Sequence, residues 1–145
     1  MADLEEIRAL LYRVCISNDE RDAQLWESCW TEDAQMGGGS RSEVAAGTAG
    51  LFEGRAGITA ALVAAWKVQT HRRRHVLTNV FLVEDGEDEA VVNSYVTLYL
   101  IKDEGRPKLE LTGSYRDHVV REDGQWKIKK RHAVMDSVYQ PGDVD

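Results

Sequence analysis

The sequence predicts an α+β fold in which three N-terminal helices pack on a curved, mixed and mainly antiparallel sheet. Up to Thr70, apolar residues recur every three or four positions, which is typical of helices with one buried face. After Thr70 the pattern changes to alternation, and long β-rich runs are separated by turns that contain Asp and Gly. A chain of 145 residues can bury one core, so we expect one domain over residues 1–145.

The first helix is expected over residues 4–16, and Asp19 follows Cys15 by four residues, close to the same apolar stripe. Asp22 is a suitable N-cap for a short second helix, because its carboxylate can accept hydrogen bonds from the free amides of the first turn. The inner side of that helix would be formed by Leu25, Trp26, Cys29 and Trp30.

A third helix is indicated after the break at residues 54–57 by four apolar residues at helical spacing, namely Ile58, Leu62, Ala65 and Trp66. The stretch between the second and third helices, residues 37–50, is rich in Gly, Ser and Ala. We interpret this stretch as a mobile loop or a loose hairpin.

Four strands are expected, with bounds at Val76–Glu84, Ala90–Ile101, Leu109–Arg121 and Trp126–Val138. Residues two apart in a strand share a face, so alternation predicts which polar side chains point inward. The inward set comprises His75, Asn79, Tyr115, Asp117 and His132, with Asp19 arriving from the first helix. Arg131 is placed on the solvent side of the last strand.

Composition argues against several classes of function. A net charge of −7 disfavours a general nucleic-acid binder, since phosphate affinity depends on Lys and Arg. No apolar stretch approaches the roughly 20 residues of a membrane span, and the acidic N-terminus does not resemble a secretory signal, so a cytoplasmic location is expected. Cys15 and Cys29 are interpreted as buried free thiols.

The segment HRRRH, residues 71–75, could suggest a metal site, because histidines four apart share a face on a helix. On a strand the two histidines stand about 13 Å apart, too far to ligate one ion. No carboxylate follows at a useful spacing, so no metal site is predicted. Arg72, Arg73 and Arg74 are interpreted as a solvated rim at the entry to the strand.

Several motifs in order resemble the SnoaL-like branch of the nuclear-transport-factor-2-like superfamily. They are Asp19 and Asp22 before an aromatic-rich helix, TEDA (31–34), FEGRAGI (52–58), RHVLTNV (74–80), GSYRDHVVREDGQWKI (113–128) and RHAVMD (131–136). The resemblance covers nearly the whole chain. It implies a cone, in which three helices close a strongly bent mixed sheet around an apolar pocket.

The resemblance also implies candidate catalytic residues. In scytalone-dehydratase-like and bile-acid-dehydratase-like relatives, a carboxylate after the first helix orients a histidine at the start of a strand, and the histidine transfers a proton. Asp19 and His75 match these positions. The tyrosines and second histidine of scytalone-dehydratase-like pockets are not matched, since residues 95–101 contain no histidine, so only the dyad is carried over.

The chemistry of such a dyad is coherent. An imidazole can take a proton near neutral pH, while a hydrogen-bonded carboxylate fixes its tautomer. Asn79, Tyr115, Asp117 and His132 are the candidates for binding a substrate oxygen. Each residue also has a structural interpretation: Asp19 as a helix end or cap, His75 and Tyr115 as core residues, and Asp117 as an ion-pair partner of Arg131 or His132.

The sequence is therefore consistent with two functions. The first is a cofactor-independent dehydratase, isomerase or cyclase that acts on a hydrophobic, oxygenated small molecule through Asp19 and His75. The second is a non-catalytic module that resembles the β subunits of ring-hydroxylating dioxygenases and binds an iron-bearing α subunit. A homodimer or homotrimer is expected in either case, because an open sheet face with apolar residues needs covering.

Overall fold

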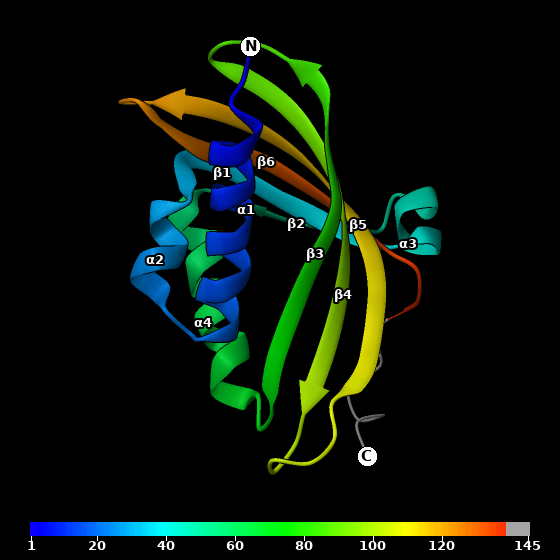
Figure 1. Ribbon diagram of the computed structural model, residues 1–145. Helices are drawn as coiled ribbons and strands as arrows, with labels where there is room; N and C mark the ends of the chain where they lie inside the picture. Colours follow the sequence, from blue (N-terminus) through cyan, green and yellow to red (C-terminus); the bar gives the residue numbers. More distant parts are fainter. Residues whose placement is uncertain (139–145) are drawn as a thin grey trace.

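The computed structural model describes residues 1–138 and has an α+β architecture (Figure 1). Helices α1, α2 and α4 lie on one side of a long, bent sheet, and the short helix α3 lies away from them, at the end of β1. In chain order the elements are α1 (Leu4–Asp19), α2 (Ala23–Ser28), β1 (Trp30–Ser40), α3 (Arg41–Ala46), β2 (Gly50–Glu53), α4 (Arg55–Val68), β3 (Arg72–Asp85), β4 (Glu89–Ile101), β5 (Lys108–Glu122) and β6 (Gln125–Met135).

The strand order in the sheet is β2-β1-β6-β5-β4-β3. Neighbouring strands are antiparallel except for β1 and β6, which run parallel, so the predicted mixed and mainly antiparallel sheet is confirmed. The strands curve around α1, which lies along the concave side (Figure 1). β3 is an edge strand, and its start lies at the same end of the molecule as the C-terminus of α1.

Local sequence explains the helix ends. The Asp3 carboxylate accepts hydrogen bonds from the amides of Glu5 and Glu6 and begins α1. The predicted cap at Asp22 is confirmed, since its side chain accepts from the amide of Leu25. α1 extends to Asp19, three residues beyond the predicted end, so Asp19 is the last helical residue.

The apolar core is concentrated in one half of the cone. Its large buried side chains include Leu10 and Leu11 of α1, Trp26 of α2, and Val92 and Ile128 of the sheet. A second, smaller cluster of Val96, Tyr115 and Ala133 lies further toward the start of β3. We call the end formed by residues 19–21, 69–73 and 102–108 the mouth of the cone.

Of the two alternatives predicted for residues 37–50, the hairpin is closer to the structure, since β1 and β2 pair antiparallel around this stretch, and the mobile loop is wrong. These residues contain the end of β1, the helix α3 with a capping box between Ser40 and Glu43, and the start of β2. The glycines allow close backbone approach rather than mobility: Gly38 has a φ of +146°, and a Cβ there would overlap the carbonyl of Ala133 on β6. β1 also includes Trp30, which the helical pattern had assigned to the second helix.

Two bulges change the predicted alternation. In β3 the register with β4 shifts between Thr78 and Phe81, and Asn79 adopts a left-handed φ of 54°, which Asn tolerates better than most residues. In β6 the register with β5 shifts beside Lys129, so Lys129 and Lys130 are both exposed. Beyond each bulge the side chains exchange faces, as a shift of one residue in a strand requires.

We predict that Gly38→Ala destabilises the protein by about 2 kcal/mol or more, because the methyl group would overlap the Ala133 backbone at a φ that L-residues avoid. The matched control is Gly57→Ala in the exposed first turn of α4, where a Cβ meets nothing and alanine favours the helix. Urea unfolding of both variants measures the difference. Equal midpoints for the two variants would contradict the proposed close approach of β1 and β6.

Candidate active site

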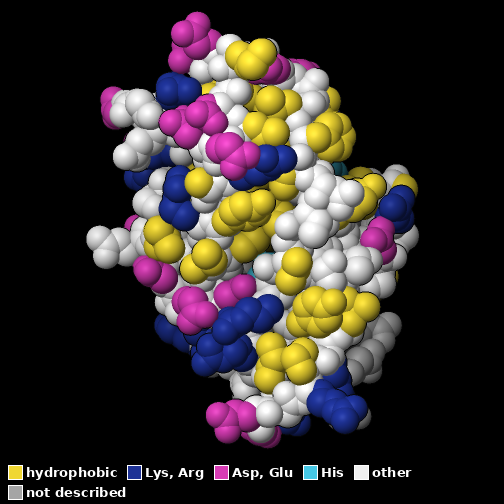
Figure 2. Space-filling model, viewed as in Figure 1, with side chains coloured by type: hydrophobic (Ala, Val, Ile, Leu, Met, Phe, Trp, Pro, Cys, Tyr) yellow, Lys and Arg dark blue, Asp and Glu magenta, His cyan; other side chains and the backbone are white. Residues whose placement is uncertain are grey.

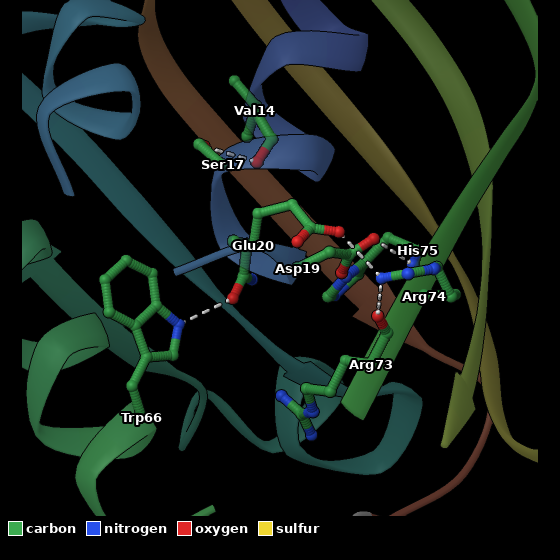
Figure 3. A network of polar contacts seen from close by, with 9 residues as sticks. Val14, Ser17, Asp19, Glu20, Trp66, Arg73, Arg74 and His75 are labelled. Carbon is green, nitrogen blue, oxygen red and sulfur yellow. Dashed lines mark hydrogen bonds and ion pairs between the residues drawn. The ribbon is translucent and has the colours of Figure 1, made fainter. Parts of the chain in front are cut away.

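Asp19 and His75 face each other at the mouth of the cone (Figure 3). Oδ1 of Asp19 lies 2.5 Å from Nδ1 of His75, and Oδ2 accepts a hydrogen bond of 2.9 Å from the backbone amide of the same residue. The side chains are only 7% and 11% exposed, respectively. One carboxylate thus holds both the ring and the backbone of His75.

The position of Asp19 is locally unfavourable. It ends α1, where the helix dipole is negative, and no basic residue occupies the last turn of that helix. Its two hydrogen bonds to His75 compensate for this placement. With the carboxylate bound to Nδ1–H, the lone pair of the imidazole lies on Nε2.

Nε2 of His75 has no hydrogen-bond partner in the part of the chain that the structure describes. It is also not among the buried side-chain nitrogens that lack a partner. A cleft of about 380 Å³ opens beside the dyad and is lined by Asp19, Glu20, Arg21, Gln69, Thr70, His71 and Arg72.

The residues next to Asp19 in the sequence form polar contacts with β3 and α4 (Figure 3). Glu20 pairs with Arg74 at 3.2 Å and with Arg72 at 3.9 Å, which ties the end of α1 to the edge strand β3. The indole nitrogen of Trp66 on α4 donates to the Asn18 side chain at 3.0 Å. The guanidinium of Arg21 reaches across the cleft to the backbone carbonyls of Gln69 and His71.

The side chain of Asp117 points inward as predicted, and its carboxylate forms an ion pair with Arg131. The two side chains form a bidentate pair at 2.7 and 3.0 Å and are 0% and 3% exposed. Burial lowers the pKa of Arg131, but the charge of Asp117 and its hydrogen bonds outweigh this effect, and the net pKa is raised. Of the interpretations of Asp117 made from the sequence, the structure supports the ion pair.

Tyr115 also faces inward, and its ring lies 3.9 Å from the guanidinium carbon of Arg131, which is cation–π geometry. Burial raises the pKa of Tyr115 to about 12, with a smaller opposing effect of Arg131, so its hydroxyl remains a hydrogen-bond donor. Burial likewise raises the pKa of the Cys15 thiol to about 11. The charges of Asp19 and Asp117 contribute to both pKa shifts in the same direction.

Two predicted site residues do not join this group. Asn79 is exposed and forms the bulge in β3, so it does not point inward two pleats beyond His75. His132 lies on the outer face of β6, because the bulge at Lys129 places Arg131 inside instead. The prediction that Arg131 faces solvent is wrong for the same reason.

Alternation in the first half of β3 holds, and it brings Arg73 to the inner face beside His75. The sequence interpretation treated Arg73 as part of a solvated rim. The signal that could have identified it is its spacing of two from His75, which requires the same face unless a bulge intervenes.

Within residues 1–138, no group of three or more His, Cys, Asp or Glu residues is arranged to hold a metal ion. None of the helices in the same part of the chain is both long and apolar enough to cross a membrane.

Residues 1–132 match the family of SnoaL-like domains, and the chain belongs to this family. No curated protein matches the sequence. The cone with helices over a bent mixed sheet, which the resemblance implied, is confirmed by solved structures.

Three of these structures illustrate the range of the fold. A protein from Novosphingobium aromaticivorans that was assigned as the β subunit of an aromatic-ring-hydroxylating dioxygenase is 16% identical, with a TM-score of 0.80, covering 92% of this chain and 89% of that one. A protein from the same organism assigned as a scytalone dehydratase is 21% identical, with a TM-score of 0.74 and coverages of 97% and 94%. A protein of unknown function from Mycobacterium tuberculosis is 26% identical, with a TM-score of 0.76 and coverages of 97% and 78%.

We predict that Asp117→Ala lowers the free energy of unfolding by about 3–5 kcal/mol, because it leaves the buried charge of Arg131 without a partner. Removing both charges together, as Asp117→Leu with Arg131→Met, should recover most of this loss. Urea unfolding of the single and double variants measures both effects. A double variant as unstable as the single one would show that the pair is not an isolated unit.

Proposed function

We propose that this protein is an enzyme that transfers a proton within its cone, with His75 as the general base and Asp19 as the residue that orients it. The observation that carries the proposal is the double hydrogen bond from His75 to one carboxylate, in a site where both side chains are nearly buried. This arrangement sets the ring orientation and the tautomer before any substrate binds. It also stabilises the imidazolium that forms when Nε2 takes a proton.

The proposed step begins on a carbon next to a carbonyl group. His75 removes the proton from this carbon, and the electron pair moves to the carbonyl oxygen to form an enolate. The hydroxyl of Tyr115, kept protonated by its raised pKa, donates a hydrogen bond to that oxygen. The proton is then returned to another carbon, which gives isomerisation, or leaves with a β-hydroxyl as water, which gives dehydration.

Of the candidate site residues predicted from the sequence, Asp19, His75 and Tyr115 have a direct role in this step. Asp117 acts indirectly, because it holds Arg131 against the ring of Tyr115. The neighbouring side chains Val96, Leu98 and Leu100 are apolar and buried, which favours a hydrophobic, oxygenated substrate. No step in this chemistry calls for a cofactor.

The first prediction from this function concerns His75. Nitrobenzisoxazole is a general probe of a base in an apolar site, since removal of its ring proton breaks the N–O bond and releases a coloured cyanonitrophenolate. We expect the protein to accelerate this reaction, and His75→Ala to reduce the rate by at least about 10²-fold, the usual contribution of a general base.

The matched control is His118→Ala. His118 also faces an acid, with its Nε2 3.5 Å from Glu89, but it lies on the outer face of β5. We expect this variant to keep the full rate. If both alanine variants react at the rate of the unmodified protein, the proposed mechanism is wrong.

A second prediction separates orientation from proton transfer. Asp19→Asn preserves the size of the side chain, but its amide cannot stabilise a positive imidazolium. We expect a rate reduction of roughly 10²-fold or more with the same probe, while the melting temperature changes little compared with His75→Ala. A full rate in Asp19→Asn would limit Asp19 to a structural role at the end of α1.

A second candidate function is an accessory subunit that binds an iron-bearing α subunit. It is favoured by the likeness to the structure assigned as a dioxygenase β subunit. It is also favoured by the outer face of the sheet, where Val76, Phe81 and Tyr95 are exposed. A neighbouring gene for an iron–sulfur α subunit, and a stable complex on co-expression, would support this function. A homodimer or homotrimer that accelerates proton abstraction by itself would support the enzyme.

A further inference from the structure

Arg73 points into the cone. His71, Arg73, His75 and Leu77 are each more buried than the residues Arg72 and Val76 that alternate with them. The cross-strand partner of Arg73 is Leu100, which is 1% exposed, and the partner of His75 is Leu98, which is 2% exposed. Arg73 therefore shares the inner face with His75, and the two residues leave the strand about 7 Å apart.

The guanidinium of Arg73 lacks an acidic partner within residues 1–138. Its two neighbours differ, because Arg72 and Arg74 both pair with Glu20. None of the ion pairs among the described residues involves Arg73, and its Nε is buried without a hydrogen-bond partner. Figure 3 shows the side chain extending from β3 toward the helical side of the site. A half-buried guanidinium in this state has donors available for a ligand.

The mouth holds several cations besides Arg73, together with the acids Asp19 and Glu20. The pKa of His71 is lowered by burial first, and then by the charges of Arg73, Arg21 and Lys102, with Glu110 opposing them. A second cleft of about 220 Å³ at the mouth is lined by Leu100, Lys102, Asp103, Gly105, Arg106 and Lys108.

The same concentration of cations is visible on the surface. In Figure 2, dark blue side chains gather in the lower part of the view, next to several magenta ones, where Figure 1 places the start of β3 and the turn between β4 and β5. The chain as a whole carries a net charge of −7, so this distribution is local to the mouth. A cation-lined cleft attracts anions.

We propose that Arg73 binds an oxyanion group of the substrate, so that the enzyme acts on apolar carbon acids that also carry a carboxylate or phosphate. This inference rests on the proposed function and narrows its substrate class. The anionic group would lie at the mouth and the acidic carbon deeper, at Nε2 of His75. Arg73 would then set the depth to which the substrate enters, and bidentate pairing would give it a defined orientation.

The test uses probes that share a naphthalene ring and differ in charge: naphthoate, naphthyl phosphate and the neutral naphthamide. Their binding to the purified protein is followed by calorimetry and by tryptophan fluorescence, since Trp66 lies near the mouth. The variant is Arg73→Gln. The matched control is Arg116→Gln, because Arg116 is an exposed arginine on the outer face of β5 without an ion pair among the described residues.

We expect the unmodified protein to bind at least one of the two anions about tenfold more tightly than naphthamide, as charge-assisted hydrogen bonds require. Arg73→Gln should abolish this preference and leave naphthamide binding unchanged, while Arg116→Gln keeps it. The anion with the larger gain in affinity over naphthamide indicates whether the anionic group of the substrate is a carboxylate or a phosphate. Absence of a preference in the unmodified protein, or its persistence in Arg73→Gln, would overturn the proposal.

The preference for anionic probes can be measured independently of proton transfer. Anion preference should persist in His75→Ala, which lacks the base but retains Arg73. A protein that prefers the anions yet fails to accelerate proton abstraction would refute the proposed function and leave the anion site in place. The reverse result would refute only the anion site.

Discussion

The contact between Asp19 and His75 joins the helical layer to the sheet at the point where the cone opens. A carboxylate at the end of a helix opposes the helix dipole, and here it is retained by two donors from a single residue of the facing strand. Because one of these donors is the backbone amide, the contact fixes where β3 begins relative to α1. The inward alternation of Arg73, His75 and Leu77 follows from that starting point.

The sequence was sufficient for the features that depend on uninterrupted periodicity. α1, α4, β4 and β5 follow from apolar spacing, and the inward positions of His75, Tyr115 and Asp117 follow from alternation within stretches that no bulge interrupts. The pairing of Asp19 with His75 needed the family resemblance as well, since these residues are 56 positions apart.

The remaining features depend on backbone irregularities that leave a weak mark on the sequence. The bulges at Asn79 and Lys129 reverse the alternation of β3 and β6, and each removed one predicted residue from the site. β1 was missed because its start is irregular in register with β6 and its end is rich in glycine. Glycine has the same local signature in a loop as in a strand that packs closely against another backbone, and only the tertiary partner distinguishes them.

The charged side chains on the inner face of the sheet differ in whether they have a partner of opposite charge. The pair of Asp117 and Arg131 forms two mutual hydrogen bonds and lies against the ring of Tyr115, and replacing such a pair with apolar residues often costs little stability. Arg73 is cationic and has no such counterpart in the described chain. The charges of Asp117 and Arg131 therefore neutralise each other, whereas Arg73 at the entrance has no acidic partner among the described residues.

The bulge in β6 also affects how this sequence is compared with its relatives. Lys129 adds one residue on the exposed side, and everything after it is displaced by one position relative to the pleat. An alignment that passes through this strand without a gap would match Arg131 to residues on the outer surface of proteins that lack the bulge. It would also match His132 to their interior. Relatives should therefore be aligned here by the face of the sheet, with a one-residue gap at the bulge, before any interior residue is judged shared or absent.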